Sequence, residues 1–122
     1  MTYSIVARDP NTGELGVAVQ TCMFAVGSIV PWARPGIGAV ATQAISEIAY
    51  GPRCLDALAS GTSAVDALEQ ARAADPGAAL RQVGVVDALK HELLAKIGQE
   101  TRTIVFALVA VVVSVSSGAL FR

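Results

Sequence analysis

The sequence predicts an α+β protein in which antiparallel strands are separated along the chain from a pair of consecutive helices. Three observations carry this prediction: a hairpin pattern at the N-terminus, two adjacent helical segments in the middle of the chain, and an apolar strand after them. Single helices do not alternate with single strands, so a doubly wound parallel sheet is not expected.

The hairpin is predicted from two runs rich in β-forming residues, 2–9 and 15–20, which flank Pro10, Asn11 and Gly13. Proline, asparagine and glycine favour the backbone angles of tight turns, so the two runs are expected to pair antiparallel.

The segment after the hairpin predicts less regular structure. Residues 23–30 predict a strand that leads into a loop, and residues 31–36 predict a turn because two prolines and a glycine exclude a continuing ladder. Residues 38–44 are apolar and small, which predicts a buried strand.

Two helices and a further strand are expected next. Leu55 and Leu58 lie on one face of the first helix, and Gly61 ends it. Ser63 and Asp66 have the spacing of a capping box, with a hydroxyl at the N-cap and an acid three residues later. The predicted bounds are 51–60 and 63–74 for the helices and 80–86 for the strand.

A change of composition near Ala88 divides the chain, because every lysine and the single histidine come after it. We expect one domain over 1–88 and an amphipathic helix over 89–102. Residues 103–121 carry no charge and as a helix would extend about 28 Å, close to the thickness of a bilayer core. The alternative interpretation is one or two buried strands, which the β-branched residues favour.

Composition excludes some functions. The net charge is −1 and only 5% of residues are aromatic, so a nucleic-acid partner is not expected. No metal or other cofactor is expected, since the chain has one histidine and no CxxC pair. Cys22 and Cys54 are expected to be buried and unreactive. No signal peptide is recognisable, so a cytoplasmic protein is predicted, tail-anchored if 103–121 spans a membrane.

The residue after the initiator methionine suggests chemistry. If Met1 is removed, Thr2 carries a hydroxyl nucleophile and a free α-amine that can serve as its base. Asp9 and Gln43 are candidate polar neighbours for an oxyanion site, although turn chemistry explains Asp9 equally well. Arg34 is a candidate source of positive charge but not of a proton, because guanidinium stays protonated.

Short blocks in unbroken order resemble an uncharacterised bacterial and archaeal family of the N-terminal nucleophile (Ntn) hydrolase superfamily. The resemblance covers about residues 2–88, and the tail 89–122 does not match it. The blocks are 2–9, 13–20, 24–27, 30–34, 36–43, 50–52 and 81–87.

The resemblance implies an αββα sandwich, here truncated, with two stacked antiparallel sheets and helices outside. It places the nucleophile at the start of the first strand, which is Thr2, and it implies hydrolysis of a small-molecule or peptide amide. Better-characterised members of the superfamily have a lysine near the nucleophile, whereas this chain has none before Lys90. Two alternatives therefore stay open: a non-catalytic module that forms homo-oligomers, and a truncated family fragment with a membrane-anchoring tail.

Overall fold

The computed structural model describes residues 2–88, which form a mixed α+β structure. Its strands make two antiparallel sheets, β1-β2 and β3-β4-β5. The elements are β1 (Thr2–Arg8), β2 (Leu15–Thr21), β3 (Pro31–Arg34), β4 (Gly38–Ala44), α1 (Tyr50–Ala59), α2 (Ala64–Ala73) and β5 (Arg81–Asp87), with single 3-10 turns at Val26–Ser28 and Ala78–Leu80.

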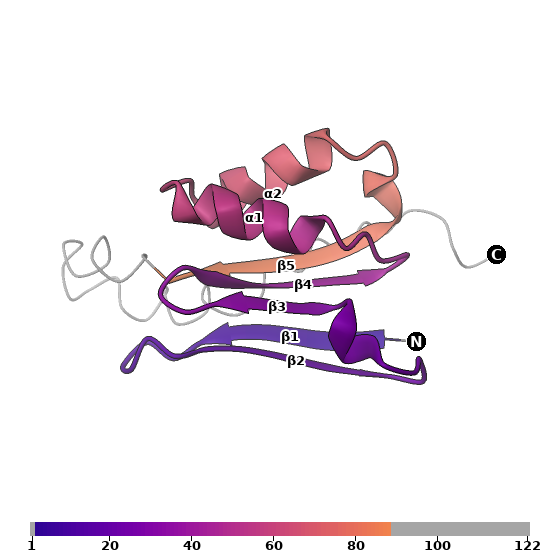
Figure 1. Ribbon diagram of the computed structural model, residues 1–122, viewed down its shortest axis with the longest axis horizontal. Coiled ribbons are helices and arrows are strands. Elements are labelled where there is room, and N and C mark those ends of the chain that lie inside the picture. The colour runs from indigo at the N-terminus through magenta and orange to yellow at the C-terminus, as the bar shows by residue number, and fades with distance from the viewer. Residues whose placement is uncertain (1, 89–122) are drawn as a thin grey trace, which may run out of the picture.

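The described residues form three layers (Figure 1). The helices α1 and α2 cover one face of β3-β4-β5, and the two-stranded sheet lies against the other face. One apolar cluster, which includes Tyr50, Leu58 and Val83, fills the space between the helices and the sheet. A second cluster, which includes Val6, Val30 and Ala39, lies between the two sheets.

The central strand β4 contributes to both clusters because its side chains alternate between its two faces. Val40 packs in the cluster under the helices, whereas Ala39 and Ala41 pack against β1-β2. Gln43 lies two residues after Ala41 and four after Ala39 on the same strand, so its side chain also faces the two-stranded sheet. The small alanine side chains allow the two sheets to approach closely at this strand.

The predicted hairpin, helices and last strand are confirmed to within about a residue. The second helix begins as expected, since the Ser63 Oγ accepts a hydrogen bond from the Asp66 backbone N at 3.1 Å and donates one to the Asp66 carboxylate at 2.7 Å. Gly61, which follows the first helix, has a φ of 89° that other residues rarely adopt.

Two expectations for the middle segment were wrong. Residues 31–34 form strand β3 rather than a turn, because Pro31 occupies the first position of an edge strand and Pro35 lies just beyond its last, so neither ring removes an interior ladder bond. Residues 23–30 contain no strand, and their one regular element is the 3-10 turn at Val26–Ser28.

The outer face of β1-β2 has no helical layer over it within residues 2–88. Ile5 is 52% exposed there, and its cross-strand partner Ala18 is exposed too.

No helix in residues 2–88 combines the length and the apolar character needed to cross a membrane. The amphipathic segment 89–102 and the apolar segment 103–121 lie outside the described residues.

Candidate active site

Thr2 is the first residue of β1, and its side chain lies on the face of the hairpin that packs against the second sheet. The antiparallel register places it opposite Thr21, the last residue of β2. The two hydroxyl oxygens are 3.0 Å apart and half-buried. The Thr21 hydroxyl also accepts a hydrogen bond from the Met23 backbone N at 3.4 Å, and either hydroxyl can be the donor between Thr2 and Thr21.

Gln43 reaches the same point from β4 in the other sheet. Its amide Nε2 donates to the Thr2 carbonyl oxygen at 3.3 Å and to the Gln82 Oε1 at 2.9 Å. The Gln43 Oε1 is buried and has no hydrogen-bond partner in the described part of the chain. A buried acceptor without a partner costs free energy, so this oxygen could accept a hydrogen bond from a bound group.

Two loops border this end of the molecule, one after β2 and one after β4. Ala25, in the loop after β2, has a φ of 56°, and Ala44, the last residue of β4, has a φ of 71°. Alanine rarely adopts these angles, and such strained residues cluster at functional sites. The two strained residues thus lie in the loop after β2 and at the end of β4, near the start of β1.

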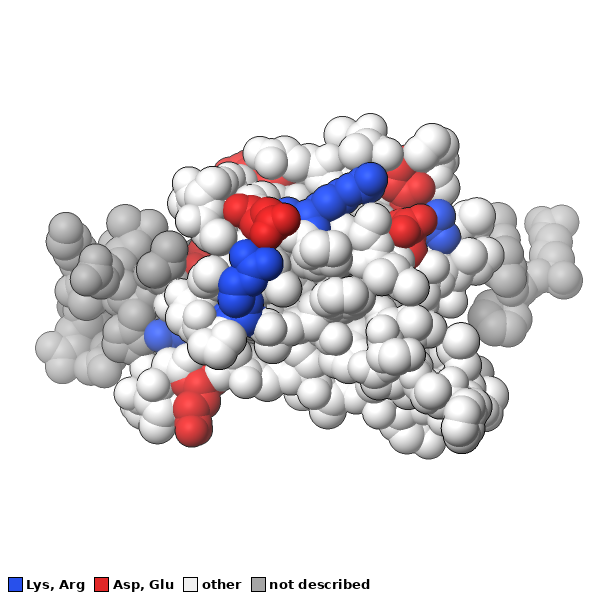
Figure 2. Space-filling model, viewed as in Figure 1, with Lys and Arg blue, Asp and Glu red and all other residues white. Residues whose placement is uncertain are grey.

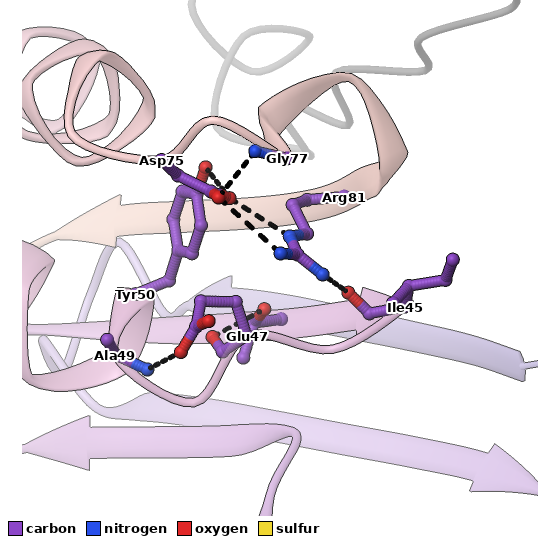
Figure 3. A network of polar contacts seen from close by, with 8 residues as sticks. Ile45, Glu47, Ala49, Tyr50, Asp75, Gly77 and Arg81 are labelled. Carbon is purple, nitrogen blue, oxygen red and sulfur yellow. Dashed lines mark hydrogen bonds and ion pairs between the residues drawn. The ribbon is translucent and has the colours of Figure 1, made fainter.

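A buried ion pair anchors the loop after β4 (Figure 3). The Arg81 Nε donates to the Asp75 Oδ2 at 2.9 Å, with 14% and 7% of the two side chains exposed. The Arg81 Nη1 donates to the Ile45 carbonyl at 2.6 Å, and the Tyr50 hydroxyl donates to Asp75 at 3.1 Å. The network therefore joins the start of β5, the start of α1 and the loop after β4.

The same contacts shift two pKa values. The Arg81 guanidinium, with further hydrogen bonds from the Gly77 backbone N and from Tyr50, lowers the pKa of Asp75 to about 2. Burial, followed by the hydrogen bond to Asp75, raises the pKa of Tyr50 to about 12. Asp75 is thus ionised and Tyr50 neutral at physiological pH, which is the arrangement that their hydrogen bond needs.

The structure brings Gln43 to Thr2 but leaves the other two candidate residues elsewhere. Asp9 follows the far end of β1, about 23 Å from Thr2 at 3.3 Å per residue. Its carboxylate accepts hydrogen bonds from the backbone N of Asn11 and of Thr12, at 2.7 and 3.2 Å, which lower its pKa. Asp9 therefore stabilises the hairpin turn.

Arg34 is also remote from Thr2. It pairs with Gly38 at the start of β4, whereas Gln43 lies five residues further along that strand, about 17 Å away. Its guanidinium forms an ion pair with Asp56 of α1 at 3.0 Å. Asp9 and Arg34 thus belong to local structure at the opposite end of the strands.

Sequence reasoning missed Thr21 and Gln82. The hairpin loop spans several residues and includes Gly13 with a φ of 76°, so the sequence alone did not fix which residue faces Thr2. Gln82 was recognised as part of a strand, but its pairing with Gln43 depends on the register of β4 and β5. For both Thr21 and Gln82, the signal that the sequence offered was a polar residue near the end of a predicted strand.

The two cysteines differ in exposure. Cys54 is buried as expected, and burial raises the pKa of its thiol to about 11. The expectation for Cys22 was wrong: it is exposed, because it follows the last ladder residue of β2. In residues 2–88 no three His, Cys, Asp or Glu side chains gather where they could hold a metal ion.

Charged side chains lie away from the start of β1 on the visible face. Figure 2 shows them over the helices and near the hairpin turn, whereas the lower right, where Figure 1 places the start of β1 and the loop after β2, is uncharged.

Comparison with known proteins identifies the family. The model of a family of unknown function, DUF1028, matches residues 2–118. The chain belongs to this family. The DUF1028 match continues past residue 88, so the expectation that the tail 89–122 does not match was wrong over most of that segment. No curated protein matches.

A solved DUF1028 structure supports the fold. The crystal structure of protein SPO2555 from Silicibacter pomeroyi, which carries the same family label, matches with a TM-score of 0.68 and 35% identity. The match covers 72% of this chain and 39% of the other. The chain therefore spans well under half the length of that relative.

Proposed function

We propose that this DUF1028 protein is an amide hydrolase of the N-terminal nucleophile type, with Thr2 as the nucleophile after removal of Met1. The observation that carries the proposal is the position of Thr2, at the first residue of β1 with its hydroxyl between the two sheets and bonded to Thr21. The family match begins at this residue, which is consistent with the proposal.

The chemistry needs one residue for both nucleophile and base. The Thr2 oxygen attacks the amide carbonyl carbon while the α-amine takes the hydroxyl proton. The tetrahedral intermediate collapses with cleavage of the C–N bond, and the ammonium returns the proton to the leaving amine. The acyl group is left as an ester on Thr2. Water, deprotonated by the same amine, then hydrolyses the ester and regenerates the hydroxyl.

Thr21 and Gln43 act as positioning residues in this proposal. The Thr21 hydroxyl holds the Thr2 oxygen, and the Gln43 amide holds the Thr2 carbonyl, so the nucleophile is fixed from both sheets. Both partners are uncharged. A free α-amine has a reference pKa of about 7.7–8.0, so a useful fraction of such amines is neutral at physiological pH.

The test begins with the N-terminus. Mass spectrometry of the purified full chain should show Thr2 as the first residue, and amide hydrolysis should be lost in Thr2→Ala and retained at a reduced level in Thr2→Ser. Gln43→Ala should lower kcat and shift the pH profile of kcat/KM, a response that mere loss of packing would not produce. A retained Met1, or unchanged hydrolysis in Thr2→Ala, would refute the proposal.

A second candidate function is favoured by a different observation. Ile5 and Ala18 are exposed on the outer face of β1-β2, so we also propose that this face mediates homo-oligomerisation. Light scattering after size exclusion should show an oligomer that Ile5→Glu dissociates, and a monomeric parent chain would refute it.

The cytoplasmic, tail-anchored location remains a proposal, and partition of the full chain into detergent tests it.

A further inference from the structure

The end of the molecule around Thr2 carries most of the exposed apolar side chains. Of the eight large hydrophobic side chains that are exposed in residues 2–88, five lie in segments that border the start of β1. Two follow β2, two follow β4, and one directly precedes β5. They are Met23, Phe24, Ile45, Ile48 and Leu80, and we refer to them as the apolar rim.

The strand registers place the rim at the Thr2 end. Thr2 pairs with Thr21, which directly precedes the segment that carries Met23 and Phe24. Gln43 donates to the Thr2 carbonyl, and Ile45 lies two residues after it. The rim therefore comes from the loops that continue the strands holding Thr2.

The loop after β4 is held in a way that leaves its apolar side chains outside. The Ile45 carbonyl is bonded to Arg81, and the Thr42 hydroxyl donates to the Glu47 carbonyl at 3.3 Å. The Ile45 side chain points away from this network (Figure 3) and is 59% exposed. These bonds hold the Ile45 and Glu47 carbonyls, while the Ile45 and Ile48 side chains of the loop stay exposed.

Phe24 is the most exposed of the group, at 95%. An exposed phenylalanine gains free energy when a ligand removes it from water, and contiguous exposed apolar surface marks binding sites. In Figure 2 the lower right of the visible face, at the start of β1 and the loop after β2, carries no charge, so a charged substrate group would lose its hydration there without gaining an ionic partner. The nearest charged side chains along the chain are Glu47, within the loop after β4, and Arg81, which is bonded to the Ile45 carbonyl.

We propose that the apolar rim binds the acyl part of the amide substrate, so the enzyme prefers an uncharged, apolar acyl group. The inference rests on the proposed Thr2 hydrolysis and names its substrate class. The acyl group is the part that stays bound to Thr2 through both chemical steps, so it is the part that the adjacent loops contact throughout the reaction. A single methylene group in a hydrophobic pocket changes kcat/KM by about 10- to 200-fold.

The test uses coumarin amides that share a leaving group and differ in the acyl chain: acetyl, hexanoyl, glutaryl and 6-aminohexanoyl. The full chain should hydrolyse the hexanoyl amide at least about 10-fold faster, in kcat/KM, than the two charged amides. In Phe24→Ser/Ile45→Ser the ratio of kcat/KM for the hexanoyl amide to kcat/KM for the two charged amides should fall toward one. Val65→Ser is the matched control, since Val65 is 57% exposed on α2, outside the rim.

The outcomes separate the two proposals. Thr2-dependent hydrolysis without a preference for the hexanoyl group overturns the acyl assignment alone. If none of the amides is hydrolysed in a Thr2-dependent way, the hydrolase proposal fails. A binding measurement then tests whether the apolar rim binds apolar acyl groups. The same amides are titrated into Thr2→Ala and followed by coumarin anisotropy. Selective hexanoyl binding that Phe24→Ser/Ile45→Ser abolishes supports the rim, and equal binding of all four refutes it.

Discussion

The two sheets bury their residues differently. In β3-β4-β5, the central strand β4 is covered on one face by the helices and on the other by β1-β2, and Gly38 to Thr42 are all buried. In β1-β2 only one face is covered, and the exposed and half-buried residues alternate along both strands. The free energy of folding in residues 2–88 is therefore expected to come mainly from the helix-covered sheet.

The candidate active site lies where the two sheets meet, at the ends of their strands. Thr2 and Thr21 come from the hairpin, and Gln43 and Gln82 come from the helix-covered sheet. The well-packed sheet thus provides a rigid support, and the hairpin contributes Thr2, the proposed nucleophile. This division matches the general need for functional groups to be held by a rigid scaffold.

The largest expected effect comes from removing a side chain under the helices. Leu58 is 2% exposed, and Leu58→Ala should lower the free energy of unfolding of the full chain by about 2–5 kcal/mol, because it leaves a cavity. Ile5→Ala is the matched change on the outer face of β1-β2 and, measured in the dissociated monomer, should cost no more than about 0.5 kcal/mol. Equal losses in urea unfolding would contradict the comparison.

The second effect concerns the ion pair between Arg81 and Asp75, which joins the start of β5 to the segment after α2. The pKa of Asp75 is lowered to about 2 from its ordinary value of 3.8. A lowered pKa stabilises the folded state above pH 3.8, and this stabilisation is lost as the pH falls toward 2. Asp75→Asn should lower the melting temperature at pH 7 and flatten its dependence on pH between about 4 and 2.

Circular dichroism melts at a series of pH values check this prediction. Glu69→Gln is the control, because Glu69 is exposed and pairs with Arg72 within the same helix. Its melting curves should follow those of the parent chain. An unchanged acid transition in Asp75→Asn would show that the ion pair does not couple the segment after α2 to the sheet.

A third, smaller effect is expected at the start of α2. The Ser63 hydroxyl accepts from the Asp66 backbone N and donates to the Asp66 carboxylate, so Ser63→Ala should cost about 1 kcal/mol, and Ser63→Thr, which keeps the hydroxyl, should restore most of it. Thermal unfolding of the three proteins provides the measurement. A loss as large as that of Leu58→Ala would mean that α2 depends on its cap more than on its packing.

The sequence predicted the elements that depend on local signals. Ser63 and Asp66 marked the start of α2, and Gly61 marked the end of α1. Strand β3 was missed because the prolines at its two ends suggested a turn, although neither interrupts its short ladder. Local residues decide helix ends, whereas the pairing of β3 with β4 depends on tertiary contacts.

The candidate site was predicted only in part, for a related reason. Gln43 contacts Thr2 across 41 residues of sequence, and strand register decides this contact. Asp9 and Arg34 were chosen for their chemistry, but the sheets carry them to the opposite end. Thr21 was overlooked, since its role depends on the hairpin register. Residue type indicated the chemistry, and register decided which residues meet.

The smallest effect is expected for the ion pair between Arg34 and Asp56, which ties β3 to α1 on the surface. The two side chains are 41% and 69% exposed, so water screens their attraction. The pair should contribute at most about 0.5 kcal/mol to the free energy of unfolding. A double-mutant cycle with Arg34→Ala and Asp56→Ala measures this contribution. Arg34→Ala should also leave Thr2-dependent hydrolysis unchanged, whereas Gln43→Ala lowers it. A large loss of activity in Arg34→Ala would mean that the charge of Arg34 acts on the nucleophile. That result would contradict the placement of Arg34 at the opposite end of the strands from Thr2.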